Sequence, residues 1–160
     1  MKLANLFIPT GVMRSGMTLR DFFEEAVRCN VPGLPYVDEQ ERMTGRVSIR
    51  DVYKHLAVPD NLVQFADMIG DQTDNLDLAD MEVNKTMALP VERYLLKAMP
   101  GVSTRSSVVK ALTLMEAHNS SYIFLIEEGV YKGVVTRMII GKRMLECIQE
   151  REQTDAAATE

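Results

Sequence analysis

The fold is decided by Val31-Pro32-Gly33-Leu34-Pro35-Tyr36-Val37-Asp38 and, after a short polar turn, Gly45-Arg46-Val47-Ser48-Ile49-Arg50-Asp51. Residues 34–37 and 45–47 are rich in strand-forming side chains, and the polar residues between them predict a hairpin. A helix is expected from about Ile49 to Leu56, ending before Pro59. A strand, a turn, a strand and a helix therefore follow one another within about 25 residues.

An amphipathic helix is predicted just before this hairpin, over residues 17–30. Thr18 is a good N-cap, and Asp21 three residues later completes a capping box. The apolar positions follow the i, i+3, i+4 spacing of one helix face: Leu19, Phe22, Phe23, Ala26 and Val27.

The same order of elements recurs about 90 residues later. A helix face is followed by strands at 122–126 and 130–135, and a helix opens at Thr136 and reaches about residue 150. Aligning Asp38 with Glu127, with one deletion in the turn, also brings Gly45 onto Gly133. The chain is therefore an internal duplication of an α/β unit, and two such small units are expected to pack together. The face of the later helix is formed by Val108, Ala111, Leu112 and Met115.

The predicted organisation is a first repeat at 1–58, an acidic connector at 59–90, a second repeat at 91–150 and a disordered tail at 151–160. The connector carboxylates lack the spacing of a calcium loop, so a solvated tether is the better interpretation. They are Asp60, Asp67, Asp71, Asp74, Asp77, Asp80 and Glu82.

The hairpin, its Gly-x-hydrophobic-Ser-x-x-Asp ending and the duplication resemble the cystathionine-β-synthase (CBS) domain family. The second copy matches more loosely, through Ile123-Phe124-Leu125-Ile126-Glu127 and Gly133-Val134-Val135-Thr136. The resemblance implies an α/β fold of tandem CBS repeats, each a small sheet packed with two helices, related by a pseudo-twofold axis. Such pairs, called Bateman modules, are regulatory and bind AMP, ADP, ATP or S-adenosylmethionine in clefts between the repeats.

The same resemblance implies which residues bind. Asp51 is expected to hold the ribose hydroxyls and Ser48 to lie near the phosphates, while the other repeat supplies a lid from residues 99–102 and 120–121. The nucleotide-binding set is Val31, Pro32, Gly33, Val47, Ser48, Arg50, Asp51, Val102, Ser121 and Thr136.

Elementary chemistry supports the roles of Ser48 and Asp51. A helix start favours phosphate through its unpaired N–H groups and dipole, and a carboxylate accepts two hydrogen bonds from a cis-diol. Arg46 and Arg50 offer charge for a phosphate. Ser48-x-x-Asp51 is equally a capping box that binds nothing. In the second copy Ile139 replaces Asp51, so that site is expected to be degenerate, with Thr136 as an N-cap.

Composition bounds the remaining choices. A net charge of −5 argues against a nucleic-acid partner. Two distant thiols, Cys29 and Cys147, with no signal peptide or membrane span, predict a cytoplasmic chain. No nucleophile elbow, Walker loop or metal-ligand cluster is present in the sequence, which predicts a non-enzyme with no cofactor beyond a regulatory ligand.

Two functions remain open: an adenine-nucleotide sensor, or a ligand-free dimerisation and interaction scaffold. A homodimer is expected through residues 139–148, because their apolar side chains exceed what one small core needs. The regulated protein is expected to be a separate, unknown effector acting in trans.

Overall fold

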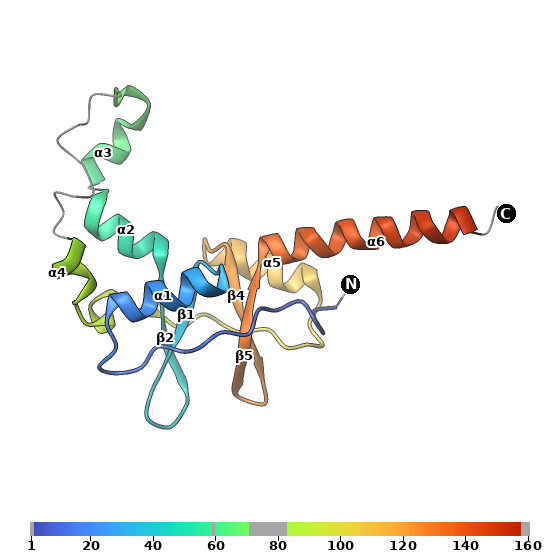
Figure 1. Ribbon diagram of the computed structural model, residues 1–160, viewed down its shortest axis with the longest axis horizontal. Helices are drawn as coiled ribbons and strands as arrows, with labels where there is room; N and C mark the ends of the chain where they lie inside the picture. The colour runs from blue at the N-terminus through green and yellow to red at the C-terminus, as the bar shows by residue number, and fades with distance from the viewer. Residues whose placement is uncertain (1, 59, 71–82, 158–160) are drawn as a thin grey trace. The chain divides into compact units, whose positions relative to one another are not determined.

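Both predicted hairpins are present, each with a helix before and after it (Figure 1). The computed structural model describes residues 2–58, 60–70 and 83–157. They form two compact units: a central unit of residues 11–98, and a terminal unit that joins residues 1–10 to residues from 99 onward. No helix in these described ranges is long and apolar enough to cross a membrane.

The central unit contains α1 (Leu19–Cys29), β1 (Gly33–Val37), β2 (Met43–Ser48) and α2 (Ile49–Ala57), close to the predicted bounds. They are followed by α3 (Asp60–Gln64), the 3-10 helix η1 (Ala66–Met68), α4 (Val83–Met87), the 3-10 helix η4 (Val91–Tyr94) and β3 (Leu96–Lys97). The three strands form an antiparallel sheet in the order β1-β2-β3.

The terminal unit contains α5 (Val108–Ala117), β4 (Tyr122–Glu127), β5 (Val130–Thr136) and α6 (Arg137–Ala157). Its hairpin is antiparallel and turns at Glu128 and Gly129, both at positive φ. Since α6 continues past residue 150 to Ala157, the prediction of a disordered tail is wrong for residues 151–157, which are helical. Their arginine, glutamate and glutamine favour a helix, although these residues show no apolar periodicity.

The capping box predicted for α1 is confirmed. Thr18 accepts a hydrogen bond from the Asp21 backbone N–H, and the Asp21 carboxylate accepts one from the Thr18 N–H (2.7 Å). The helix ends at Asn30 in the left-handed region (φ 53°). Leu19, Phe22 and Ala26 are each 0 % exposed, which confirms these three positions of the predicted face, whereas Val27 of that face is 68 % exposed.

Backbone hydrogen bonds confirm the register of the duplication. The Ile49 N–H donates to the Pro32 carbonyl (3.0 Å), and at the aligned positions the Arg137 N–H donates to the Ser121 carbonyl (3.2 Å). Met13 pairs with β1 through residues 35 and 37, and Val102 pairs with β4 through residues 124 and 126 in the same way. The two copies therefore share their non-local hydrogen bonds as well as their element order.

The segments that lead into the two repeats, residues 1–10 and 89–98, are exchanged. Ile8 pairs with Val134 of β5 (2.8 and 2.9 Å), in the second repeat, whereas β3 pairs with β2 in the first. Leu3, in the first of these lead segments, is 0 % exposed in the core of the terminal unit. The boundaries of the two compact units therefore differ from those of the two repeats predicted from the sequence. The reason is that each lead segment pairs with the hairpin of the other repeat.

Two aligned glycines make room for the exchanged segments. A Cβ at Gly133 would lie 2.5 Å from the Ile8 carbonyl oxygen, and one at Gly45 would lie 3.0 Å from the Leu96 carbonyl oxygen. Since real Cβ atoms do not approach backbone oxygen as closely as at Gly133, that position excludes a side chain. The glycine of each repeat therefore marks where a lead segment crosses the hairpin.

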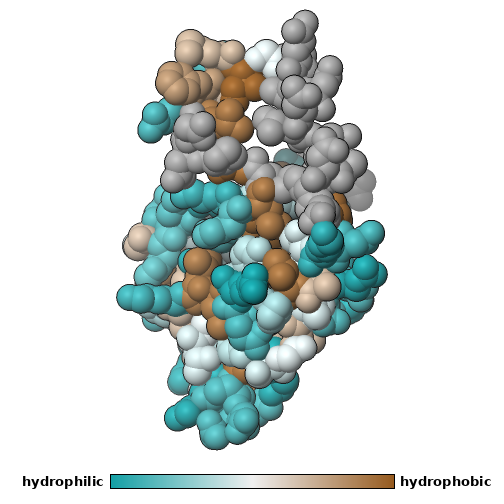
Figure 2. Space-filling view, turned by 90° about the vertical axis from the view of Figure 1, so that its left-hand side faces the viewer, coloured by the Kyte–Doolittle hydropathy of each residue, from teal (hydrophilic) through white to brown (hydrophobic). Residues whose placement is uncertain are grey.

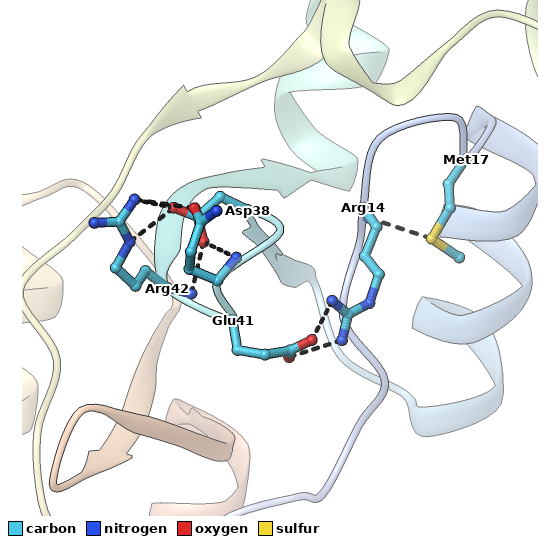
Figure 3. Close-up of polar contacts among 6 residues, drawn as sticks. Arg14, Met17, Asp38, Glu41 and Arg42 are labelled. Atoms are coloured by element: carbon cyan, nitrogen blue, oxygen red, sulfur yellow. Dashed lines mark hydrogen bonds and ion pairs between the residues drawn. The ribbon is translucent and has the colours of Figure 1, made fainter.

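Charged side chains fasten the hairpin tip of the central unit to the segment before α1 (Figure 3). Arg14 forms a two-pronged ion pair with Glu41 (2.6 and 2.8 Å), which lies in the left-handed region. Asp38 accepts hydrogen bonds from the backbone N–H groups of Gln40 and Arg42 (both 2.9 Å). The Arg42 backbone bond is the main cause that lowers the pKa of Asp38. Figure 2 shows this tip as a hydrophilic end of the face.

The described part of the predicted connector exposes apolar side chains. Phe65 is 52 % and Met68 is 74 % exposed, on or beside η1, and Figure 2 shows apolar residues gathered there. The described residues around them form only the short elements α3 and η1. The connector carboxylates of residues 71–82 lie outside the described residues.

Glu25 ties the start of the central unit to α1, and this predicts a pH dependence. Its carboxylate accepts hydrogen bonds from Arg28 (2.7 and 2.8 Å) and from the Gly11 N–H (2.5 Å). The Arg28 bonds are the largest cause that lowers its pKa from 4.5 to about 2. Because the pKa is lowered on folding, the stabilisation is complete above pH 4.5 and is lost as the pH falls towards 2.

Glu25→Gln should therefore lower the free energy of unfolding by roughly 1–3 kcal/mol at pH 7, since a charged hydrogen-bond network is weakened. The difference from wild type should shrink between pH 4.5 and pH 2, as measured by urea denaturation. Glu24→Gln, at the exposed neighbouring position, is the matched control. Parallel pH profiles for wild type and Glu25→Gln would contradict this assignment.

Candidate functional site

The start of β1, the end of β2 and the first turn of α2 meet at one corner of the central unit. Gly33 pairs with Ser48 and Leu34 with Val47, and the Ile49–Pro32 hydrogen bond closes the corner. The structure therefore brings together seven of the ten predicted nucleotide-binding residues: Val31, Pro32, Gly33, Val47, Ser48, Arg50 and Asp51.

Ser48 has a hydroxyl that the helix does not use. It is the N-cap residue of α2, in extended conformation (φ −129°, ψ 135°), yet its side chain makes no capping hydrogen bond. The residue is 4 % exposed. The capping-box interpretation of Ser48 and Asp51 is therefore wrong in this structure. A hydroxyl at the positive end of a helix dipole, with its capping capacity unused, is suited to an anionic ligand group.

Asp51 lies one turn into α2 from Ser48 and is half-buried. Its backbone carbonyl is 2.7 Å from Nδ1 of His55, which fixes the second turn of the helix. The corresponding residue of the second copy, Ile139, packs against the hydrophobic core of the terminal unit. One corner thus carries a carboxylate and the other an apolar side chain.

The two arginines differ in their surroundings. Arg46 Nε donates to the Lys97 carbonyl of β3 (3.3 Å), and its role in neutralising a phosphate stays a prediction. Arg50 is exposed on the first turn of α2, beside Asp51. Both arginines therefore belong to the elements that form this corner, Arg46 to β2 and Arg50 to α2.

The other three predicted residues belong to the terminal unit. Thr136 pairs with Tyr122 at the end of the hairpin, and the neighbouring Ser121 is exposed. Thr136 Oγ1 accepts a hydrogen bond from the Ile139 N–H (3.2 Å), which confirms its predicted N-cap role. Val102 lies further along the sheet, beside residues 124–126, and is 2 % exposed in the core. A shared cleft that unites these residues with the Ser48 corner stays a prediction.

Arg137 is a charged group at the second corner that the sequence interpretation passed over. It is the first residue of α6, and its guanidinium forms an ion pair with Glu116 (2.7 Å) and a hydrogen bond to the Ser120 carbonyl (3.4 Å). Its position directly after Thr136 was the available signal. At the second corner, the Thr136 hydroxyl therefore caps its own helix and the Arg137 guanidinium is held in an ion pair.

A groove of about 530 Å³ lies elsewhere in the central unit, between residues 11–17 and α1. Its lining includes Met13, which is only 1 % exposed, and the carboxylates of Asp21 and Glu25. Both carboxylates are engaged, in the capping box and with Arg28 respectively. Within the described ranges no three His, Cys, Asp or Glu side chains converge as metal ligands.

Comparison with known proteins identifies the fold. No family model matches the sequence, and none of the curated proteins is similar to it in sequence. Solved structures are similar to it at low sequence identity. One is the CBS domain of a CBS domain-containing membrane protein from Sphaerobacter thermophilus, with a TM-score of 0.61, 17% identity, and 89% of this chain and 86% of that chain covered.

Two further structures show the same likeness. A CBS domain-containing protein of unknown function from Bacillus anthracis has a TM-score of 0.61 and 18% identity, over 91% of this chain and 94% of that one. CBSX2, solved in complex with AMP, has a TM-score of 0.61 and 19% identity, over 91% and 97%. Together with the duplicated hydrogen bonds and the two matching corners, these similarities show that the chain has the fold of a CBS domain pair.

Proposed function

We propose that this protein is a non-catalytic regulatory module that binds an adenine nucleotide at the Ser48–Asp51 corner. The observation that carries the proposal is the hydroxyl of the buried N-cap residue Ser48, which makes no capping bond although it stands at the start of α2. In the second copy the equivalent hydroxyl of Thr136 is used by its own helix.

The chemistry of the corner fits a phosphorylated nucleoside. The N–H groups at the start of α2 and the Ser48 hydroxyl suit a phosphate, and Asp51 suits a pair of ribose hydroxyls. The AMP complex of CBSX2, a protein of the same fold, supports an adenine nucleotide as the ligand class. We propose AMP or ADP before ATP or S-adenosylmethionine, because Pro32 and Gly33 bring no basic side chain for a longer phosphate chain.

A thermal-stability screen tests this proposal. A ligand that binds only the native state raises the melting temperature, and saturation at 100 times Kd contributes about 2.7 kcal/mol. We expect AMP or ADP to raise it, and uridine monophosphate, which has the same ribose and phosphate, to raise it less. If AMP, ADP, ATP and S-adenosylmethionine all leave it unchanged, the sensor function fails and a ligand-free interaction scaffold replaces it.

A further inference from the structure

The residues that follow α2 carry large apolar side chains that the core does not cover. No described residue between Val52 and Val91 belongs to the buried core of the central unit. Figure 2 shows apolar side chains gathered over this part of the molecule. Exposed apolar side chains that gather in one region indicate an interaction surface. We call this surface the connector patch, and its members, each 39–74 % exposed, are Val58, Val63, Phe65, Met68 and Ile69.

Two of these side chains are held together by the turns of the backbone. The Phe65 N–H donates to the Leu62 carbonyl (3.1 Å), and the Met68 N–H donates to the Phe65 carbonyl (2.9 Å). Side chains three residues apart in such i→i+3 turns lie one above the other. Phe65 and Met68 therefore form one pair on the surface of η1.

The negative charge of the chain is concentrated at this patch. Between Lys54 and Lys85 the sequence contains seven carboxylates and no lysine or arginine. This stretch therefore carries a charge of −7, whereas the whole chain carries −5. Asp67, in η1, is exposed and takes part in none of the ion pairs between described residues. The connector patch is thus an apolar surface in strongly negative surroundings.

Charge and apolar surface together select the kind of partner. Nucleic acids and anionic lipid surfaces carry phosphate charges, which the carboxylates repel. A second copy of this chain would bring the same seven carboxylates, and like charges that face each other oppose association. A helix with one apolar face and one basic face complements both properties of the patch.

We propose that the connector patch docks a basic amphipathic helix of a separate protein, with Phe65 and Met68 in apolar contact and Asp67 paired with a cation. Phenylalanine and methionine are enriched at the centres of interfaces, and methionine adapts to differently shaped partners. The negative charge of the stretch speeds the approach of the basic helix, and salt screens that attraction. This docking goes beyond nucleotide binding and does not rest on it.

Fluorescence anisotropy with a labelled peptide and the full chain tests the docking. The probe repeats Leu-Lys-Lys-Leu-Leu-Lys-Leu twice, which gives a helix one apolar and one basic face, and a second peptide has glutamate in place of each lysine. We expect the lysine peptide to bind at least roughly tenfold more tightly than the glutamate peptide, and the difference to shrink as sodium chloride is added.

Phe65→Ser with Met68→Ser should weaken binding of the lysine peptide at least roughly tenfold, because a few buried anchors carry most of the energy of an interface. Val109→Ser with Met138→Ser is the matched control, since it removes two exposed apolar side chains from the terminal unit, and it should leave binding unchanged. Circular dichroism should show the same helix content for all these variants, because the changed side chains are exposed.

Asp67→Lys separates a role in recognition from a role in folding. It should weaken binding of the lysine peptide and strengthen binding of the glutamate peptide, because it reverses the charge beside the two anchors. Local unfolding of η1 would instead weaken binding of both peptides, and that result would contradict the pairing of Asp67 with a cation.

Three other results would overturn the docking proposal. The first is that the lysine peptide does not bind, or binds wild type and the Phe65→Ser, Met68→Ser variant equally. The second is a preference for phosphatidylglycerol vesicles over the lysine peptide, which would indicate a membrane as the partner. The third is self-association of wild type that the Phe65→Ser, Met68→Ser variant loses, which would show that a second copy occupies the patch.

Discussion

Deleting residues 2–10 is expected to unfold the terminal unit, whose other residues begin at Met99, and to leave the central unit folded. Leu3 and Leu6 are 0 and 8 % exposed in the core of the terminal unit, and Ile8 exchanges two backbone hydrogen bonds with Val134. The loss of one buried leucine costs about 2–5 kcal/mol. The loss of both leucines and of the backbone pairing therefore costs about as much as the whole free energy of unfolding of a typical domain, about 5–15 kcal/mol.

Amide hydrogen exchange read by mass spectrometry measures this effect. Residues 108–117 and 122–136 should lose protection in the truncated protein, while residues 19–29 and 33–48 keep it. Loss of protection first in the central unit, or none in either unit, would contradict the exchange of lead segments.

Two point variants test the same contact with matched controls. Leu3→Asp should act like the truncation, and Asn5→Asp, at an exposed position of the same segment, should not. Gly133→Val should displace Ile8, because its Cβ would lie 2.5 Å from that carbonyl oxygen. Gly141→Ala meets no atom within 4 Å and should be neutral or stabilising by up to about 1 kcal/mol, since alanine favours a helix.

Asp51→Ala is expected to weaken binding of AMP or ADP by at least roughly tenfold, which corresponds to 1.4 kcal/mol. The proposed role of Asp51 is to hold two ribose hydroxyls by charge-assisted hydrogen bonds, each typically contributing about 1.5–3 kcal/mol. Folding should be unaffected, because Ser48 and Asp51 form no capping box that the substitution would break. Titration calorimetry on wild type and variant measures the difference.

Asp67→Ala is the matched control, since it removes an exposed aspartate far along the chain from the corner. Ile139→Asp is the converse variant and should create weak binding at the second corner if a carboxylate is what that corner lacks. Because Ile139 packs against the core, its folding must be verified first. Equal affinity of wild type and Asp51→Ala would place the ligand elsewhere.

Local structure followed closely from the sequence. The α1 capping box and the two hairpins depend on signals within about ten residues, such as Thr18 with Asp21 or the left-handed turn at Glu128 and Gly129. The duplication strengthened each of these predictions, because the same order of helix, strand, strand and helix had to fit both repeats. The corner that joins Pro32 to Ile49 was therefore predictable from its two strands.

The long-range pairings were not predictable in this way. Ile8 pairs with Val134, more than a hundred residues later in the chain. No local pattern in residues 1–10 indicates which strand they pair with. Gly133 carried a signal, since a glycine inside a strand indicates a close backbone approach, but not which backbone approaches. For Ser48, propensity favoured a cap, and only the three-dimensional placement shows that its hydroxyl is not used as one.

The exchanged lead segments also impose an order on folding during synthesis. The central unit is one continuous stretch, residues 11–98, and all its strands are available once β3 has left the ribosome. The terminal unit combines residues 1–10 with residues from 99 onward, so its first segment waits, unpaired, until β5 has been made. Closing so long a loop is slow relative to local pairing, because its entropy is lost before the contacts form. The nascent chain thus carries Leu3, Leu6 and Ile8 as an exposed apolar segment, which a chaperone can bind until the last hairpin pairs with it.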